Sequence, residues 1–162
     1  MYKPVLETFN IRQLQVYAAV CLRNYCRHKG IWHQSINDLI QHLVSLMTAK
    51  YLPDWERRGT LLAVVGRGGP LPEGVVEIVD AGDLKDFSEL IEFCVEVGIV
   101  DMYGAHTNKP FEFMEICIDI LTKNNIKLPP ADMLRKYGRG SCMWGDPVSE
   151  SELSKIIDAY GL

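Results

Sequence analysis

The sequence lacks the motifs that identify the commonest metal, nucleotide and redox sites. None of its four histidines belongs to an HxxxH or HExxH pattern, and its five cysteines form no CxxC pair. The glycine-rich stretch GRGGPLP (66–72) is not followed by the Lys-Ser or Lys-Thr of a P-loop, and it has Leu71 where a dinucleotide-binding turn needs a third glycine. These absences argue against zinc hydrolases, disulfide frameworks and nucleotide-binding folds. We therefore expect neither a metal nor a cofactor.

Long apolar runs are also absent. The run at 61–65 is far too short to cross a bilayer, and the first residues lack the apolar core and small-residue cleavage site of a signal peptide. The length of 162 residues, with 48% hydrophobic and 23% charged residues, is typical of one folded globular domain. We expect a single domain over residues 1–162 that is cytoplasmic and has no membrane partner.

Basic residues are scarce in one long stretch of the chain. Between residues 73 and 119 there are twelve acidic and two basic side chains, a local charge of −10, whereas the whole chain carries −4. Helices whose charges mainly provide solubility usually alternate acids with lysines, and this stretch rarely does. A segregated acidic surface favours a basic partner and weighs against nucleic acid. The residues predicted to bind that partner are Glu73, Glu77, Asp80, Asp86, Glu89, Glu92, Glu96, Glu112, Glu115 and Asp119.

Apolar residues recur every three or four positions over most of the chain, which predicts helices. The predicted segments are 10–28, 35–51, 83–97, 110–124 and a C-terminal helix that begins with a Ser149–Glu152 capping box, with shorter helical turns near Pro72 and over 131–136. The run at 61–65 fits either a short helix or a buried strand. The expected fold is mainly α, a compact single-domain bundle of about six to eight helices joined by Gly- and Pro-rich loops.

The same spacing predicts how some residues pack. Apolar residues cover most of the circumference of helix 110–124, so we expect this helix to be central. Arg12 falls outside the apolar face of its helix and is expected in solvent, and Gly98 is expected to end helix 83–97. The apolar positions that hold cysteine predict buried structural thiols at Cys21, Cys94 and Cys117.

One stretch is a candidate for acid–base catalysis. EVGIVDMYGAH (96–106) brings Asp101, Tyr103 and His106 close together in the sequence, and these side chains are suitable for proton transfer if they converge. The preferred interpretation is structural: Asp101 caps backbone groups of a turn and Tyr103 packs against the protein. We therefore expect that the protein is not an enzyme, and a small helical enzyme with this site stays as the alternative.

In size, acidity and helical organisation the chain resembles the immunity proteins of bacterial toxin systems, including those of contact-dependent growth inhibition. The acid-rich stretch and the connecting segments GRGGPLP and EVGIVDMYG belong to this resemblance, which carries no functional residue over position by position. It implies a non-catalytic inhibitor whose partner is a cognate toxin domain. A nuclease-type toxin has a basic site that accepts phosphates, and an array of carboxylates can occupy it. A helical adaptor is a further alternative, and the loops 66–72 and 138–147 are alternative interfaces.

Overall fold

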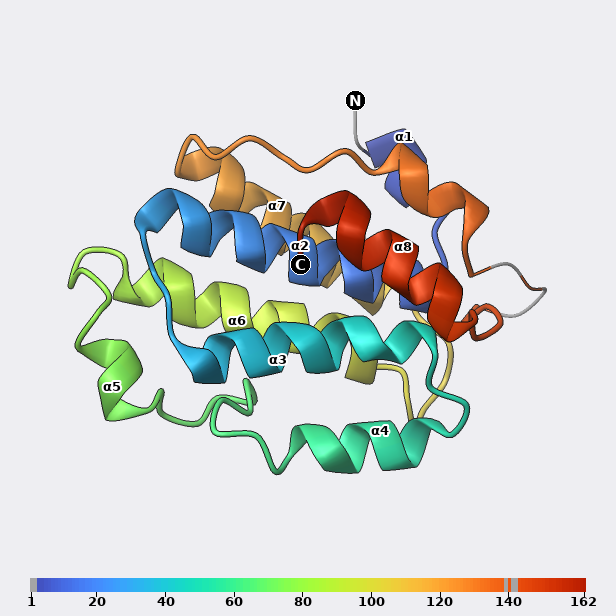
Figure 1. Cartoon of the computed structure of the whole chain (residues 1–162), viewed down its shortest axis with the longest axis horizontal. Helices are drawn as coiled ribbons and strands as arrows, with labels where there is room; N and C mark the ends of the chain where they lie inside the picture. Colours follow the sequence, from blue (N-terminus) through green and yellow to red (C-terminus); the bar gives the residue numbers. More distant parts are fainter. Residues whose placement is uncertain (1–2, 139, 141–142) are drawn as a thin grey trace.

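The computed structural model describes residues 3–138, 140 and 143–162, and all their regular secondary structure is helical (Figure 1). This confirms the mainly α bundle. The α-helices are α1 (Lys3–Leu6), α2 (Ile11–Lys29), α3 (Gln34–Val44), α4 (Leu52–Gly59), α5 (Glu73–Val76), α6 (Leu84–Ile99), α7 (Lys109–Lys123) and α8 (Glu150–Tyr160), and short 3-10 helices occupy Ser45–Met47 and Asp132–Lys136.

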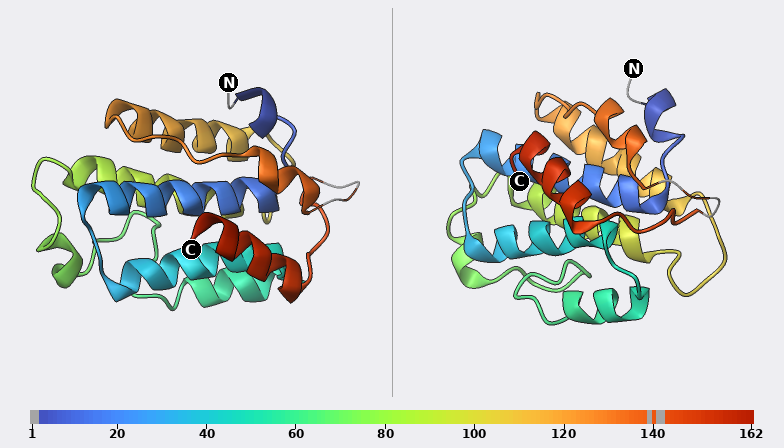
Figure 2. Two further views of the ribbon diagram at one scale, coloured as in Figure 1. Left: turned by 45° about the horizontal axis from the view of Figure 1, so that its top comes forward. Right: turned by 45° about the vertical axis from the view of Figure 1, so that its right-hand side comes forward.

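Helix α2 is the central helix of the bundle. It packs against α3, α6 and α7, and every residue from 11 to 22 is buried (Figures 1 and 2). The expectation that helix 110–124 would be central is therefore wrong. The corresponding helix, α7, packs against α2 and α6 but leaves Phe111, Phe113 and Ile116 only partly buried. Apolar residues lie around most of α7 because two helices, α2 and α6, pack against different sides of it, and not because it is enclosed on all sides.

Polar side chains buried along α2 bind backbone carbonyls of short 3-10 helices and loops. Arg12 is buried, contrary to expectation, and donates hydrogen bonds to the carbonyls of Leu46 and Gly145. Gln13 donates to two further carbonyls in the segment 134–137, at 2.8 and 2.5 Å. Buried carbonyls need hydrogen-bond donors, and short 3-10 helices and loops do not supply one for every carbonyl. These polar residues therefore hold the 3-10 helices and the segments beside them against the central helix.

Several helix ends lie where local sequence signals place them. Helix α2 ends at Gly30, which adopts the left-handed conformation with φ of 67°. The capping box at Ser149 is present and begins α8, and Pro110 lies in the first turn of α7. The start of α3 differs from the prediction: His33 is its N-cap, and the His33 ring nitrogen accepts a hydrogen bond from the amide of Ser35.

Gly98 lies inside α6 and does not end it. The helix continues to Ile99, and the Cα of Gly98 faces the buried side chain of Gln15 on α2. A Cβ at position 98 would lie 2.0 Å from Gln15 Oε1. The glycine therefore permits the close approach of α2 and α6. From the sequence alone, this packing role could not be distinguished from that of a glycine that ends a helix.

Residues 54–82, whose secondary structure was the hardest to predict, contain most of α4, the short α5 and a long irregular connection between them. Pro53 lies in the first turn of α4, where its missing N–H costs no hydrogen bond. The run 61–65 forms neither a helix nor a strand, and Leu61 is exposed. The short helix near Pro72 is confirmed as α5, which spans only four residues, Glu73–Val76.

Helix α4 is held to the bundle mainly through Trp55. This residue is the buried side chain of the helix, and its ring stacks on His42 of α3 with 4.5 Å between ring centroids. Its indole N–H donates to the carbonyl of His42 at 2.9 Å. Burial under α4, together with the positive charge of Arg58, lowers the pKa of His42 to about 4.

We expect the stability of the protein to fall on acidification through His42. The folded-state pKa is below the ordinary value of about 6.5, so the unfolded chain binds the proton more readily. The contribution of neutral His42 to the free energy of unfolding is therefore fully present above about pH 6.5, and it is lost as the pH falls toward 4. The ring is partly accessible to water, so we expect a loss of about 1–2 kcal/mol, less than the full shift implies. Urea unfolding of wild type and His42→Gln at pH 7 and pH 4.5 measures it. An equal loss in both proteins would contradict this assignment.

Candidate functional site

The acidic residues of 73–119 do not form one uncompensated surface. Bases from distant parts of the chain neutralise some of them: Lys3 pairs with Glu115 at 2.9 Å, and Lys123 pairs with Asp86 at 2.8 Å. Neighbouring lysines pair with others, Lys109 with Glu112 at 3.1 Å and Lys85 with Glu89 at 4.0 Å. The local charge of the sequence therefore overstated the negative charge that is free to attract a partner.

Asp86 has a structural role. It accepts hydrogen bonds from Lys123 and from the side-chain amide of Asn124, and these bonds lower the pKa of its carboxyl group. Both donors are at the C-terminal end of α7, and Asp86 is in the first turn of α6. The carboxylate thus ties the two antiparallel helices together, and its carboxyl oxygens are already bound.

Six of the ten predicted residues have no ion pair within the part of the chain that the structure describes. They are Glu73, Glu77, Asp80, Glu92, Glu96 and Asp119. Glu96 differs from the other five because it is partly buried. Burial raises the pKa of Glu96, the charge of Arg67 opposes that shift, and Glu92 adds to it. The unpaired carboxylates concentrate on α5, the turn after it and the outer side of α6.

Three of the unpaired carboxylates lie in the same short segment, 73–80, as exposed apolar side chains. Trp32, Val76 and Ile78 are 71%, 39% and 44% exposed. The connection from α2 to α3, which contains Trp32, touches α5: a Cβ on Gly74 would lie 3.2 Å from the ring of His33. The α5 patch is defined as these three apolar residues together with Glu73, Glu77 and Asp80.

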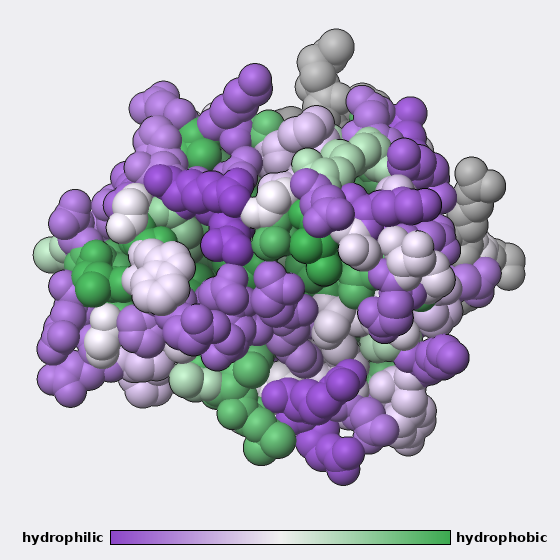
Figure 3. All heavy atoms as spheres, in the orientation of Figure 1, coloured by the Kyte–Doolittle hydropathy of each residue, from purple (hydrophilic) through white to green (hydrophobic). Residues whose placement is uncertain are grey.

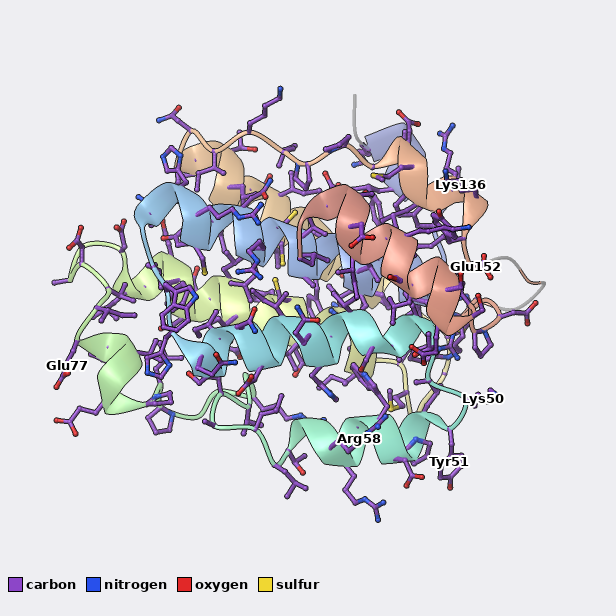
Figure 4. The ribbon with its side chains drawn as sticks, in the orientation of Figure 1. Lys50, Tyr51, Arg58, Glu77, Lys136 and Glu152 are labelled. Carbon is purple, nitrogen blue, oxygen red and sulfur yellow. The ribbon has the colours of Figure 1, made fainter. Side chains whose placement is uncertain are left out.

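The figures show the surroundings of the α5 patch. Hydrophobic surface is visible at the end of the molecule where α5 lies, and hydrophilic atoms surround it (Figure 3). Glu77 projects outward from α5, far from Lys50, Tyr51 and Arg58 around α4 (Figure 4). Glu77 is therefore remote from the bases Lys50 and Arg58. An apolar centre within a charged rim is the usual organisation of a protein–protein interface.

The candidate acid–base residues do not converge. Asp101 is buried, and its two carboxylate oxygens accept hydrogen bonds from the backbone N–H and the hydroxyl of Thr107, at 2.8 and 2.6 Å. His106 Nδ1 is 3.8 Å from Asp101, but Tyr103 is 70% exposed and lies beside Glu56 of α4. The expectation that Tyr103 packs is therefore wrong, whereas the expected backbone-capping role of Asp101 is confirmed.

A large hollow of the surface involves only one residue of that trio, His106. Its volume is about 760 Å³, and it lies between the start of α2 and the start of α7. His106 and Thr107 line it, but Asp101 and Tyr103 do not. Gly138, Gly140 and Met143 also line it. Positions 139 and 141–142 lie outside the described residues. The predicted alternative interface 138–147 falls partly on those positions.

The three cysteines that were predicted to be buried structural thiols are buried. Cys21, Cys94 and Cys117 are buried, and the sulfur atoms of Cys94 and Cys117 are 3.7 Å apart. Burial raises the pKa of the Cys21 and Cys94 thiols, which keeps them protonated. Over residues 3–138, 140 and 143–162, no three His, Cys, Asp or Glu side chains are grouped as metal ligands would be.

No helix in the described part of the chain is both long enough and apolar enough to span a bilayer. Comparisons with family models, with curated proteins and with solved structures gave no match.

Proposed function

We propose that this protein is a non-catalytic binding protein that neutralises a basic partner, a cognate toxin domain, through the α5 patch. The observation that carries the proposal is the combination within that patch of exposed apolar side chains and carboxylates without ion pairs. Each component has a separate physical role in binding a protein.

The apolar side chains supply the energy of binding. Tryptophan is among the residues that contribute most at protein interfaces, and Trp32 exposes 71% of its surface to water. Val76 and Ile78 add apolar area on the neighbouring element. Covering these side chains removes that area from water. The patch is small, so its contribution depends on a partner that encloses Trp32.

The carboxylates favour a partner of positive charge and raise the rate at which it associates. Glu73, Glu77 and Asp80 have no ion pair among the described residues, so an incoming basic group does not need to displace an internal lysine or arginine. Opposite charges around an interface mainly raise the association rate and exclude partners of the wrong sign.

The resemblance to immunity proteins supports the more specific part of the proposal. A small, acidic, helical protein that resembles them is expected to protect the cell that makes a toxin by blocking it. A nuclease-type toxin has a basic site suited to phosphate, and the α5 patch offers carboxylates in place of phosphates. In this proposal the protein performs no chemistry, and its cytoplasmic location follows from where the toxin acts.

The test measures binding to a toxin domain sought among the products of neighbouring genes. Surface plasmon resonance at several salt concentrations should show association that slows markedly as ionic strength rises. Trp32→Ala should weaken binding about tenfold or more, equivalent to at least about 1.4 kcal/mol. The triple change Glu73→Lys, Glu77→Lys, Asp80→Lys should weaken it at least as much and reduce its salt dependence.

A second triple variant provides the matched control. Glu112→Lys, Glu115→Lys and Asp119→Lys make the same change in net charge on α7, away from the α5 patch, and should alter affinity by less than about threefold. Equal losses in the two triple variants would show that net charge alone matters, and the α5 patch would not be the interface. No binding by the folded wild-type protein, together with no protection of cells that express the toxin, would overturn the proposal.

A further inference from the structure

A narrow groove adjoins the α5 patch. It has a volume of about 280 Å³ and lies between the irregular segment 63–71 and the outer side of α6. Pockets for drug-sized ligands usually begin at about 300 Å³, so the groove suits a smaller group such as one side chain. Leu71 lines it, and the chain continues through Pro72 directly into α5. The groove and the α5 patch are therefore neighbouring parts of one surface.

The floor of the groove is apolar and is shaped by a glycine. Val65, Leu71 and Ile91 line it. Gly66 has a φ of 73°, and a Cβ there would lie 2.5 Å from Val95 on α6. The backbone of the segment consequently lies directly on the helix. Apolar walls of this kind accommodate the methylene stem of a long side chain whose charged end stays near solvent.

The groove also offers hydrogen-bond acceptors that are not in use. Among the hydrogen bonds of the described residues, none involves a backbone group of 63–71. The carbonyl groups of this segment therefore accept no hydrogen bond from another described residue. Glu92 lines the groove, is exposed, and has no ion pair in the part of the chain that the structure describes. Arg67, the nearby base, pairs instead with Glu56 of α4.

We propose that this groove receives one arginine side chain of the basic partner, an inference that rests on the proposed function. The guanidinium group is planar and has five N–H donors, which matches a carboxylate together with carbonyl oxygens better than the compact ammonium group of lysine does. Glu92 accepts from the guanidinium, carbonyls of the glycine-rich segment accept from its remaining N–H groups, and the apolar floor covers the stem. The arginine and the α5 patch then anchor the same partner at two adjacent points.

The first test uses tetra-arginine and tetra-lysine peptides as probes and follows amide signals by NMR. Tetra-arginine should shift the amides of Gly68, Gly69 and Glu92, and tetra-lysine should do so at least about fivefold more weakly. Glu92→Gln should reduce the affinity for tetra-arginine at least about fivefold. Asp119→Asn is the matched control, because it neutralises another exposed and unpaired carboxylate, on α7. It should leave that affinity within about twofold.

Three results would overturn the groove as an arginine site: equal shifts with both peptides, shifts confined to α5, or equal effects of the two variants. The second test separates this proposal from the proposed function. If the toxin domain binds wild type and Glu92→Gln equally well, the groove assignment fails and the α5 patch stands. If the toxin domain binds neither protein, the proposed function fails, and the peptide titration still decides whether the groove selects arginine.

Discussion

Replacing Trp55 by alanine is expected to lower the free energy of unfolding by about 3–5 kcal/mol, the usual cost of truncating a buried tryptophan. Trp55 is 1% exposed and is the buried side chain by which α4 packs on the bundle. The substitution removes the stacking on His42 and two hydrogen bonds, to the carbonyl of His42 and to the hydroxyl of Ser45. The remaining side chains of α4 are only partly buried or exposed, so nothing replaces these contacts.

Urea unfolding followed by circular dichroism measures this loss, and Trp32→Ala is its matched control. Trp32 is largely exposed, so the same chemical change there should alter stability by less than about 0.5 kcal/mol. Loss of the covering indole should also raise the pKa of His42 toward its ordinary value, because water then reaches the ring. A loss below about 1 kcal/mol for Trp55→Ala would show that other contacts hold α4.

Local signals in the sequence were enough to predict most of the helices. Capping boxes, a proline in the first turn and a glycine at the C-terminus act within a few residues, so they can be recognised without tertiary structure. Gly30, Pro110 and Ser149 illustrate this. Gly98 shows the limit of such signals. A glycine that permits close packing and a glycine that ends a helix look the same in one sequence, and only the position of Gln15 distinguishes them.

The candidate site was predicted less completely, because charge pairing depends on tertiary structure. Asp86 and Glu115 belonged to the acidic stretch, and their partners Lys123 and Lys3 lie outside it. No local pattern reveals such pairs. Trp32 was not among the predicted site residues, although an aromatic residue between a helix-ending glycine and the next helix is a usable signal of exposure. Only the fold shows that its neighbour His33 lies against Gly74 of α5.

The central position of α2 was hidden by its polar residues. Arg12, Gln13 and Gln15 interrupt the apolar pattern, and buried polar residues cannot be distinguished from solvent-exposed ones by spacing alone. Each of them donates to a backbone carbonyl of another segment. The loops therefore depend on the helix for hydrogen bonds as well as for apolar contacts, and a substitution in α2 should reveal this dependence.

Gln13→Leu is expected to lower the free energy of unfolding by about 3 kcal/mol. The leucine fills similar space, so the loss comes from hydrogen bonds. The carbonyl of Tyr137 loses its side-chain donor, and a buried unpaired group costs about 1–3 kcal/mol. The carbonyl of Leu134 loses one of two donors and still accepts from the backbone N–H of Tyr137. The backbone N–H of Asn10 also loses its acceptor in the capping box that begins α2. Gln34→Leu is the matched control, because Gln34 is exposed and hydrogen-bonds only the side chain of Asp38 among the described residues.

Gln13→Glu separates the two causes of that loss. A carboxylate still accepts from the N–H of Asn10, but it cannot donate to the two carbonyls, and burial opposes its charge. The folded-state pKa of this glutamic acid should therefore be raised, and the folded protein should hold its proton more readily than the unfolded chain. The deficit relative to wild type should then be larger at pH 7 than at pH 4, where the protonated acid can donate to one carbonyl. Urea unfolding at the two pH values measures it. A deficit independent of pH, or a Gln13→Leu variant within about 1 kcal/mol of wild type, would mean that α2 does not hold the 134–137 segment through these hydrogen bonds.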